Sequence, residues 1–308
     1  MTFWPISSGI FLGWSLGSND AANIFGTGVA TNMIKFRTAV TLIAVFVVAG
    51  ALLEGTKVMS TVGELSDLTP VTAFYCTLSA GILVAVMSKY GVPVSTSQAI
   101  IGAILGAGLL NNSADFHKLT KIVLCWVLTP VGGIIFSILF YRILAALFRS
   151  KIMSIYFRAG ILKLGIILAG SYGAYALGSN NVANVTGVYV GAGMLHPFAA
   201  ALIGSLSISL GVITYSKNVM YTVGKQIFPL DDFSAFIVVI SQATTVHIFT
   251  QIGVPVSASQ AVVGAVVGIG LLNNVRAVQS GQLLTILAGW ILTPIGTALI
   301  TMGLVSIF

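Results

Sequence analysis

A long internal repeat constrains the fold of this chain more than any other sequence feature. Residues 91–112, GVPVSTSQAIIGAILGAGLLNN, recur at 253–274 as GVPVSASQAVVGAVVGIGLLNN, and 16 of the 22 positions are identical. A second pair keeps the same order, because GSNDAAN at 17–23 is matched by GSNNVAN at 178–184. Self-similarity of this kind marks a duplicated structural unit. We predict a first repeat at 1–145, a cytoplasmic linker at 146–158 and a second repeat at 159–308.

Both repeats are too apolar for a water-soluble protein. Hydrophobic residues make up 57% of the 308 positions and charged residues 7%, with a mean hydropathy of +1.03. So few charges could not cover the surface of a soluble domain, so lipid must be the solvent for most of the chain. Most apolar segments are near the ~20 residues that a helix needs to cross the hydrocarbon core. The sequence therefore predicts an all-α polytopic membrane protein with about five segments in each repeat. These segments lie at about 3–31, 38–55, 70–88, 92–110 and 119–141, then 160–192, 198–214, 233–252, 254–272 and 282–307.

The charged and sulfur-containing residues argue against several classes of function. The 14 basic residues are scattered between apolar segments without interleaved aromatic residues, so membrane topology explains them better than nucleic-acid binding. Cys76 and Cys125 have neither metal-site nor disulfide spacing, and no cofactor is expected. The apolar segments hold no paired carboxylates, HExxH motif or Ser/Lys pair, so the sequence does not indicate an enzyme.

The basic residues also indicate how the repeats are inserted, because Lys and Arg concentrate in cytoplasmic loops. If the fourth segment of each repeat makes one net crossing, each repeat has five crossings, and the chain can place both termini outside. If the fourth segment folds back instead, the best split of basic residues is only 8 to 6. Five crossings in each repeat are therefore favoured. An odd number of crossings means that the second repeat is inserted upside down relative to the first, as in many secondary transporters. Whether 92–110 and 254–272 span or re-enter stays open. The favoured topology places 11 residues inside (Lys35, Arg37, Lys89, Arg142, Arg149, Lys151, Arg158, Lys163, Lys217, Lys225 and Arg276) and three outside (Lys57, Lys118 and Lys121).

Four polar motifs interrupt the apolar segments. The Gly-Ser-Asn runs at 17–20 and 178–181 are poor helix-interior sequences, so a break or an unwound turn at the centre of the protein is predicted there. The Pro-Val-Ser runs at 93–98 and 255–260 are typical of helix starts, where free N–H groups and the helix dipole favour an oxyanion. Small polar residues also serve helix packing in membranes. Four clusters in duplicated pairs are more than packing requires, so a binding site is favoured.

The charges within these motifs indicate what else must bind. No Lys or Arg occurs in any of the four, so an anion held there would call for co-bound cations. Asp20 is the one carboxylate among them, and an ionisable residue inside the membrane is a functional candidate by default. Elsewhere, Glu54 and Lys57 are expected to form a surface pair, and His247 to be a hydrogen-bonded packing residue.

At these motifs the sequence resembles the inorganic phosphate transporter (PiT) family, which pairs a G-x-N-D-x-x-N signature with a P-[VI]-S-x-[ST]-x element in each of two inverted halves. GSNDAANIFGTGVATN matches the first signature closely, and the resemblance covers nearly the whole chain. It implies a secondary active symporter in the cell membrane that carries inorganic phosphate with a cation by alternating access, commonly with sodium and in some members with protons or as a metal-phosphate complex. It also implies frequent assembly as a homodimer within membrane lipid. A sulfate symporter of the same fold is the nearest alternative, and an anion channel is a more distant one.

Residue by residue, the resemblance implies sodium at the first signature and further cation contacts at the second. The second signature departs from the family at Asn181, where Asp is usual, so a cation site there should be weaker or be completed by the anion. Gln98 and Gln260 stand where many members have His, and an amide fits either anion. The implied cation-binding residues are Asn19, Asp20, Asn23, Asn180, Asn181 and Asn184, and the implied substrate-binding residues are Ser95, Thr96, Ser97, Gln98, Ser257, Ser259 and Gln260.

Overall fold

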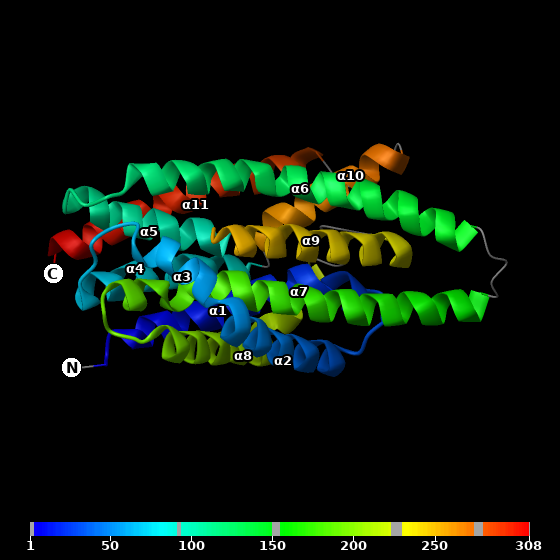
Figure 1. Cartoon of the computed structure of the whole chain (residues 1–308), viewed down its shortest axis with the longest axis horizontal. Coiled ribbons are helices and arrows are strands. Elements are labelled where there is room, and N and C mark those ends of the chain that lie inside the picture. The colour runs from blue at the N-terminus through cyan, green and yellow to red at the C-terminus, as the bar shows by residue number, and fades with distance from the viewer. Residues whose placement is uncertain (1–2, 91–93, 150–154, 223–229, 274–279, 308) are drawn as a thin grey trace.

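Eleven α-helices account for most of the residues that the computed structural model describes, which are 3–90, 94–149, 155–222, 230–273 and 280–307 (Figure 1). Seven of these helices are long and apolar enough to cross a membrane, so this part of the chain is an all-helical polytopic membrane protein, as predicted. The helices are α1 Ile6–Ala30, α2 Phe36–Glu54, α3 Thr56–Gly63, α4 Pro70–Lys89, α5 Thr96–Leu110, α6 Phe116–Arg149, α7 Ile155–Gly191, α8 Pro197–Thr222, α9 Asp232–Ile252, α10 Ala258–Asn273 and α11 Ser280–Ile307.

The corresponding helices of the two repeats run in opposite directions. Figure 1 shows both chain ends at one end of the molecule, which we call the terminal end, and the end of α6 and the start of α7 at the other, which we call the linker end. The helix α1 starts at the terminal end, whereas its counterpart α7 finishes there, and the Tyr189 hydroxyl near the end of α7 donates to the Pro5 carbonyl at 2.7 Å. Residues 150–154 of the predicted linker lie outside the described residues.

Helices α4 and α5 form a hairpin, and α9 and α10 form its counterpart. The chain leaves α5 where it entered α4, because the Asp115 N–H donates to the Leu65 carbonyl at 2.9 Å and the Ser66 and Ser113 hydroxyls are 2.8 Å apart. The returning arms α5 and α10 have 15 and 16 residues, fewer than the ~20 of a full crossing. The described parts of 92–110 and 254–272 are therefore short returning arms whose first residues are buried inside the molecule.

The predicted breaks at 17–20 and 178–181 are wrong, because α1 and α7 continue as regular helices through both motifs. The Ser18 hydroxyl donates to the Ser15 carbonyl at 2.7 Å and the Ser179 hydroxyl to the Ala176 carbonyl at 3.0 Å, so each serine bonds within its own intact helix. The two serine hydroxyls therefore find partners without unwinding the backbone.

Close helix crossings explain the glycines of the same motifs. A Cβ atom at Gly17 would collide with the Ile208 carbonyl on α8, and one at Gly178 would collide with the Val47 carbonyl on α2. Glycine lets two helix backbones approach this closely, as is common in membrane proteins. Gly17 and Gly178 are therefore explained by close helix packing and not by a break in the helix.

The two repeats are interleaved by such crossings. Helix α1 of the first repeat packs on α8 of the second, and α2 packs on α7. In the same way α5 crosses α11, where Gly102 faces the Pro294 carbonyl, and α10 crosses α6, where Gly264 faces the Pro130 carbonyl. Each repeat therefore completes the packing of the other.

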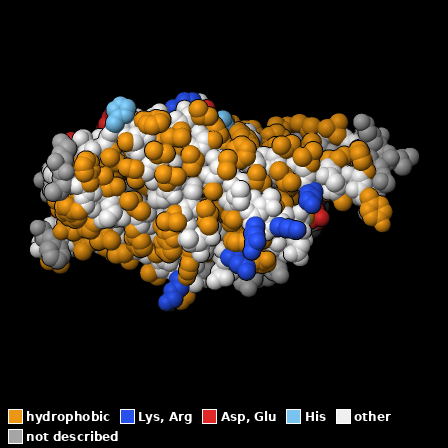
Figure 2. Space-filling view, turned by 90° about the horizontal axis from the view of Figure 1, so that it is seen from below, with side chains coloured by type: hydrophobic (Ala, Val, Ile, Leu, Met, Phe, Trp, Pro, Cys, Tyr) orange, Lys and Arg blue, Asp and Glu red, His pale blue; other side chains and the backbone are white. Residues whose placement is uncertain are grey.

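The outer surface is largely hydrophobic, as expected of a protein solvated by lipid. Exposed leucine and isoleucine side chains line α6 and α11. Figure 2 shows hydrophobic side chains over most of one face, interrupted by a group of Lys and Arg to the right of centre. The predicted surface pair forms, with Lys57 Nζ 3.6 Å from Glu54 Oε1. His247 is a hydrogen-bonded residue, as predicted. Its partners are the Tyr172 hydroxyl at 2.8 Å and the Glu54 carboxylate at 2.9 Å.

Candidate functional site

Asn19 holds the segment that precedes α5 against α1. Its Oδ1 accepts a hydrogen bond from the Val94 N–H at 3.3 Å, and its Nδ2 donates to the Ser88 hydroxyl at 2.9 Å. Val94 lies in the buried segment that leads into α5, and Ser88 lies near the end of α4. One amide thus positions both arms of the first hairpin.

Asn180 makes the matching contacts in the second repeat. Its Oδ1 accepts from the Val256 N–H at 2.9 Å, and its Nδ2 donates to the Thr250 hydroxyl at 3.1 Å and to the Val254 carbonyl at 3.0 Å. Both of its polar atoms are already bonded to the second hairpin. In this arrangement the amide is a positioning group, and cation ligation by Asn19 and Asn180 stays a prediction.

Ser97, in the first turn of α5, joins the two hairpins at the centre. Its hydroxyl donates to the Val256 carbonyl at 2.8 Å, in the segment that leads into α10. It also accepts from Asn184 Nδ2 on α7 at 2.8 Å, and that same Nδ2 lies 2.8 Å from Asn181 Oδ1. The structure therefore brings three predicted site residues together around one hydroxyl.

The two predicted helix starts are present. The Ser95 hydroxyl accepts from the Gln98 N–H at 3.2 Å and caps α5, while the Ser257 hydroxyl accepts from the Gln260 N–H at 3.3 Å at the start of α10. The Ser257 hydroxyl also pairs with that of Ser259 at 2.8 Å. Because Ser97 links these starts, two helix N-termini with their positive dipole ends meet at the centre of the protein, which favours an anion there.

Buried polar atoms without a hydrogen bond are concentrated in the duplicated segments. Among the described residues, ten buried side-chain atoms have no partner, and six of them belong to 17–23, 93–98, 178–184 and 255–260. Leaving such an atom unpaired costs about 1–3 kcal/mol, so a concentration of them is expected where a ligand supplies the missing bonds. The set offers both N–H and oxygen, which suits an anion together with a cation. The six atoms are Asn23 Oδ1, Thr96 Oγ1, Gln98 Oε1, Asn181 Nδ2, Asn184 Oδ1 and Gln260 Oε1.

Asp20 is the one buried charged side chain among the residues whose exposure is described, and it is 3% exposed. Its carboxylate lies 3.5 Å from Asn23 Nδ2, a long contact between neutral and charged groups of the same helix. A buried carboxylate is costly unless it is paired with a cation. Carboxylate and amide oxygens are suitable ligands for a hard cation, so Asp20 and the unpaired Asn23 Oδ1 fit a sodium ion.

Sequence reasoning missed Ser88 and Thr250, which bond the two positioning asparagines. The signal was present in the chain, because these hydroxyl residues lie 162 positions apart, the same spacing that separates 91–112 from 253–274. It also missed Gln242 on α9, a fully buried side chain that lies outside every duplicated motif.

Comparison with known proteins identifies the family of the chain. The model of the phosphate transporter family matches residues 16–301. A protein of Pyrococcus horikoshii that is named as a phosphate permease is 30% identical over 92% of both chains, and the sulfate permease CysP of Bacillus subtilis is 30% identical over 97% of this chain and 86% of its own. A solved structure named as the sodium-dependent phosphate transporter is 25% identical, with a TM-score of 0.87 over 99% of this chain and 98% of that one. The chain therefore belongs to the phosphate transporter family, and it is a transporter and not an enzyme.

Proposed function

We propose that this protein is a secondary active transporter that carries inorganic phosphate together with sodium by alternating access. The observation that carries the proposal is the set of six unpaired polar atoms in the same motifs that supply the two helix starts and the buried carboxylate of Asp20. The solved relative, whose name includes both phosphate and sodium, matches nearly the whole chain and supports this choice of substrate and cation.

The chemistry of the unpaired atoms favours phosphate over sulfate. Three of them are the side-chain amide oxygens of Gln98, Asn184 and Gln260. Gln98 and Gln260 are predicted substrate-binding residues, and Asn184 belongs to the second-repeat signature. Near neutral pH phosphate keeps at least one P–OH group and can donate to such an oxygen, whereas sulfate has no proton to donate. Thr96 can donate or accept, and Asn181 presents an N–H to the anion.

Sodium fits the first repeat better than the second. Asp20 supplies a negative charge and Asn23 an unpaired oxygen, and Asn19 lies beside them on α1. In the second repeat the matching position is Asn181, which offers no charge and whose unpaired atom is a nitrogen. A cation at Asn180, Asn181 and Asn184 would therefore depend on the charge of the anion.

Sulfate transport is the second candidate, since CysP is as similar in sequence as the Pyrococcus protein. Uptake of labelled phosphate and sulfate into proteoliposomes, with and without a sodium gradient, separates the two. We expect concentrative phosphate uptake that stops when the gradient is collapsed. Thr96→Val, which removes an unpaired hydroxyl while keeping the shape of the side chain, should weaken phosphate uptake by about tenfold at low substrate. Preference for sulfate, or passive equilibration without sodium, would contradict the proposal.

The antiparallel repeats support an inverted topology with both termini outside, and labelling can test it. Single cysteines would be placed at the exposed positions His117, Ala146 and Ser306 in a protein lacking Cys76 and Cys125. We expect His117→Cys and Ser306→Cys to react with an impermeant reagent from outside, and Ala146→Cys from the cytoplasm only. If Ser306→Cys labelled together with Ala146→Cys, the repeats would not be inverted. The predicted homodimer and the repeat boundaries stay predictions.

A further inference from the structure

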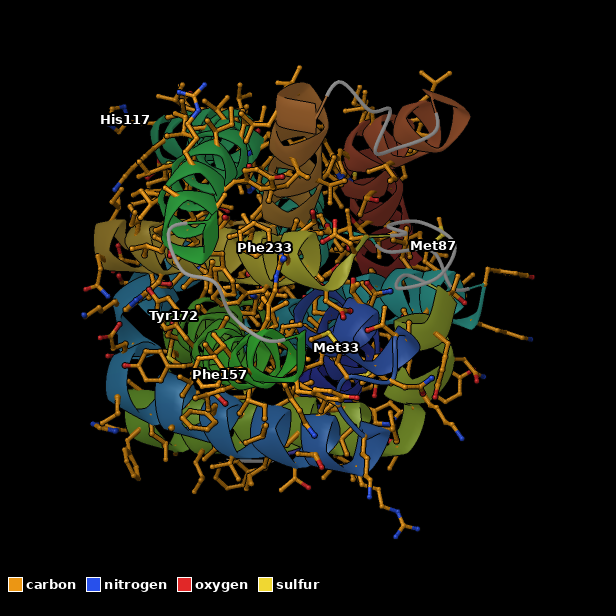
Figure 3. All side chains as sticks on the ribbon, turned by 90° about the vertical axis from the view of Figure 1, so that its right-hand side faces the viewer. Met33, Met87, His117, Phe157, Tyr172 and Phe233 are labelled. Atoms are coloured by element: carbon orange, nitrogen blue, oxygen red, sulfur yellow. The ribbon has the colours of Figure 1, made fainter. Side chains whose placement is uncertain are left out.

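A cluster of charged and titratable side chains lies outside the proposed site, where α9 of the second repeat meets α2 and α3 of the first. Glu54, the last residue of α2, has its Oε2 at 2.9 Å from His247 Nε2 and accepts from Gln251 Nε2 at 2.6 Å. Lys57 Nζ of α3 donates to Gln251 Oε1 at 2.6 Å. Figure 3, viewed from the linker end, shows α9 beside α7, on which Tyr172 is labelled, and the Tyr172 hydroxyl lies 2.8 Å from His247 Nδ1. Side chains that carry charge therefore join the two repeats at this place.

The contacts of His247 suit both of its protonation states. A carboxylate only accepts hydrogen bonds, so His247 Nε2 carries the proton that points at Glu54. The neutral ring accepts the Tyr172 hydroxyl proton at Nδ1, and the protonated ring donates there instead, because a hydroxyl can do either. Histidine ordinarily takes up a proton between about pH 5 and 8. His247 can therefore bind a proton without any neighbouring side chain having to move.

A proton on His247 converts its hydrogen bond to Glu54 into an ion pair. Glu54 is the nearest charge, whereas Lys57 lies 3.6 Å from the other carboxylate oxygen and is 42% exposed, and Lys121 is exposed and bonds the Ile252 carbonyl. Attraction to the near carboxylate therefore outweighs repulsion by the two lysines. Helix α10 has no titratable residue, and that of α1 is Asp20 of the central site. The titratable groups on the other helices packed around His247 are Glu54 (α2), Lys57 (α3), Lys121 (α6), Tyr172 and Tyr175 (α7).

This cluster holds the same turn that the central site uses. Gln251 directly follows Thr250, whose hydroxyl accepts from Asn180 Nδ2. From the other side, the Thr61 hydroxyl of α3 donates to the Gly253 carbonyl at 2.5 Å. The turn between α9 and α10 is thus held by Asn180 on one side and by the first repeat on the other. A tighter hold by the first repeat restrains the second hairpin at the central site.

The first repeat has no such cluster. The spacing of 162 positions places Ala85 opposite His247, and the spacing of 161 that separates 17–23 from 178–184 places Tyr215 opposite Glu54. Tyr215 packs on Trp14 instead, with the ring centres 5.4 Å apart. Aromatic packing is enough to join the helices at that place, so the duplicated fold does not require a charged cluster. The cluster acts on one of the two hairpins only.

We propose that Glu54 and His247 form a proton-operated latch that holds the second hairpin against the first repeat. The predicted topology places Lys57 outside, so the latch takes its proton from the outer solution. Proton uptake tightens the latch, because a hydrogen bond between charged partners is roughly twice as strong as a neutral one. A restrained hairpin leaves its present conformation more slowly, so acid slows the transport cycle. This effect on transport rests on the proposed function, whereas the latch itself does not.

A double-mutant cycle tests the latch without transport. Melting temperatures in detergent would be compared at about pH 5.5 and 8.5 for the wild type, His247→Gln, Glu54→Gln and the double variant. Glutamine keeps the hydrogen bonding but takes up no proton. We expect each single substitution to lower the melting temperature at the acid pH, the double variant to lose less than the sum, and this coupling to shrink at the alkaline pH. His117→Gln is the control and should show no coupling to Glu54→Gln, because Figure 3 shows His117 at the edge of the molecule.

Uptake into proteoliposomes at saturating phosphate tests the effect on transport. Each variant is divided by the wild type at the same outer pH, so the change in the charge of phosphate itself cancels. We expect His247→Gln and Glu54→Gln to exceed the wild type about fivefold at the acid pH and to equal it at the alkaline pH, with His117→Gln equal at both.

Two results would overturn the latch. Losses of melting temperature that are additive, or that do not change with pH, would show that no proton joins the pair. Coupling in the melting temperatures with an uptake ratio that is constant across pH would show a structural contact only. A protein that carries no phosphate would instead overturn the proposed function, and the double-mutant cycle would still decide whether the latch exists.

Discussion

Phosphate uptake by the Asp20→Asn protein is expected to lose its dependence on sodium while the protein remains folded. The substitution keeps the shape of the side chain but removes the one buried charge among the residues whose exposure is described. Removing one partner of a buried charge pair costs about 3–5 kcal/mol, so sodium affinity should fall by at least about a hundredfold. Uptake measured against sodium concentration, at fixed phosphate, gives the result directly.

The second repeat provides the matched control for this experiment. Asn181 occupies the position of Asp20 in α7, and Asn181→Asp introduces there the carboxylate that the first repeat has at Asp20. We expect this protein to keep sodium-stimulated uptake and to change, at most, the number of sodium ions carried per phosphate. Full sodium coupling in Asp20→Asn would place the cation site elsewhere.

Gly17→Ala is expected to abolish most of the folded protein, although it adds only a methyl group. The new Cβ would collide with the Ile208 carbonyl at the crossing of α1 and α8, and a backbone group cannot rotate aside as a side chain can. Overpacking a tight contact costs typically ~1–3 kcal/mol and occasionally more, which is a large part of the stability of a marginal protein. The yield of monodisperse protein and its melting temperature would report the loss.

Gly303→Ala is the control for that effect. It makes the same chemical change within a helix, where alanine is favoured over glycine, but its methyl group meets no neighbour within 4 Å. This protein should be at least as stable as the wild type. If Gly17→Ala also melted at the wild-type temperature, the close crossing of α1 and α8 would be wrong.

The features predicted correctly from the sequence are those that depend only on residues close together in the chain. Apolar length indicated the helices, and Pro followed by Ser indicated the starts of α5 and α10, because capping depends on residues within one turn. The motif at 17–20 was misjudged because Gly and Asn suit both an unwound turn and a tight crossing. The choice is made by Ile208, which is distant in the sequence, and no local pattern reports it.

The site residues show the same limit. The Asn19 amide could serve as a cation ligand or as a group that positions the hairpin. Only the positions of Val94 and Ser88 show that it holds the hairpin in place. Gln242 escaped notice for a different reason, because the search for duplicated motifs finds what the repeats share. The signal at Gln242 is a difference between them, glutamine against Ala80.

The interleaving of the repeats has a consequence for the history of the protein. A solitary repeat would present the glycine surfaces of its first two helices with no partner helix to cover them, because those partners lie in the other half of the chain. Such a unit could be complete only when paired with a second copy lying antiparallel to it. A gene for one repeat could therefore give a complete protein only if two copies of its product met in opposite orientations, and fusion of two such genes would make that encounter intramolecular.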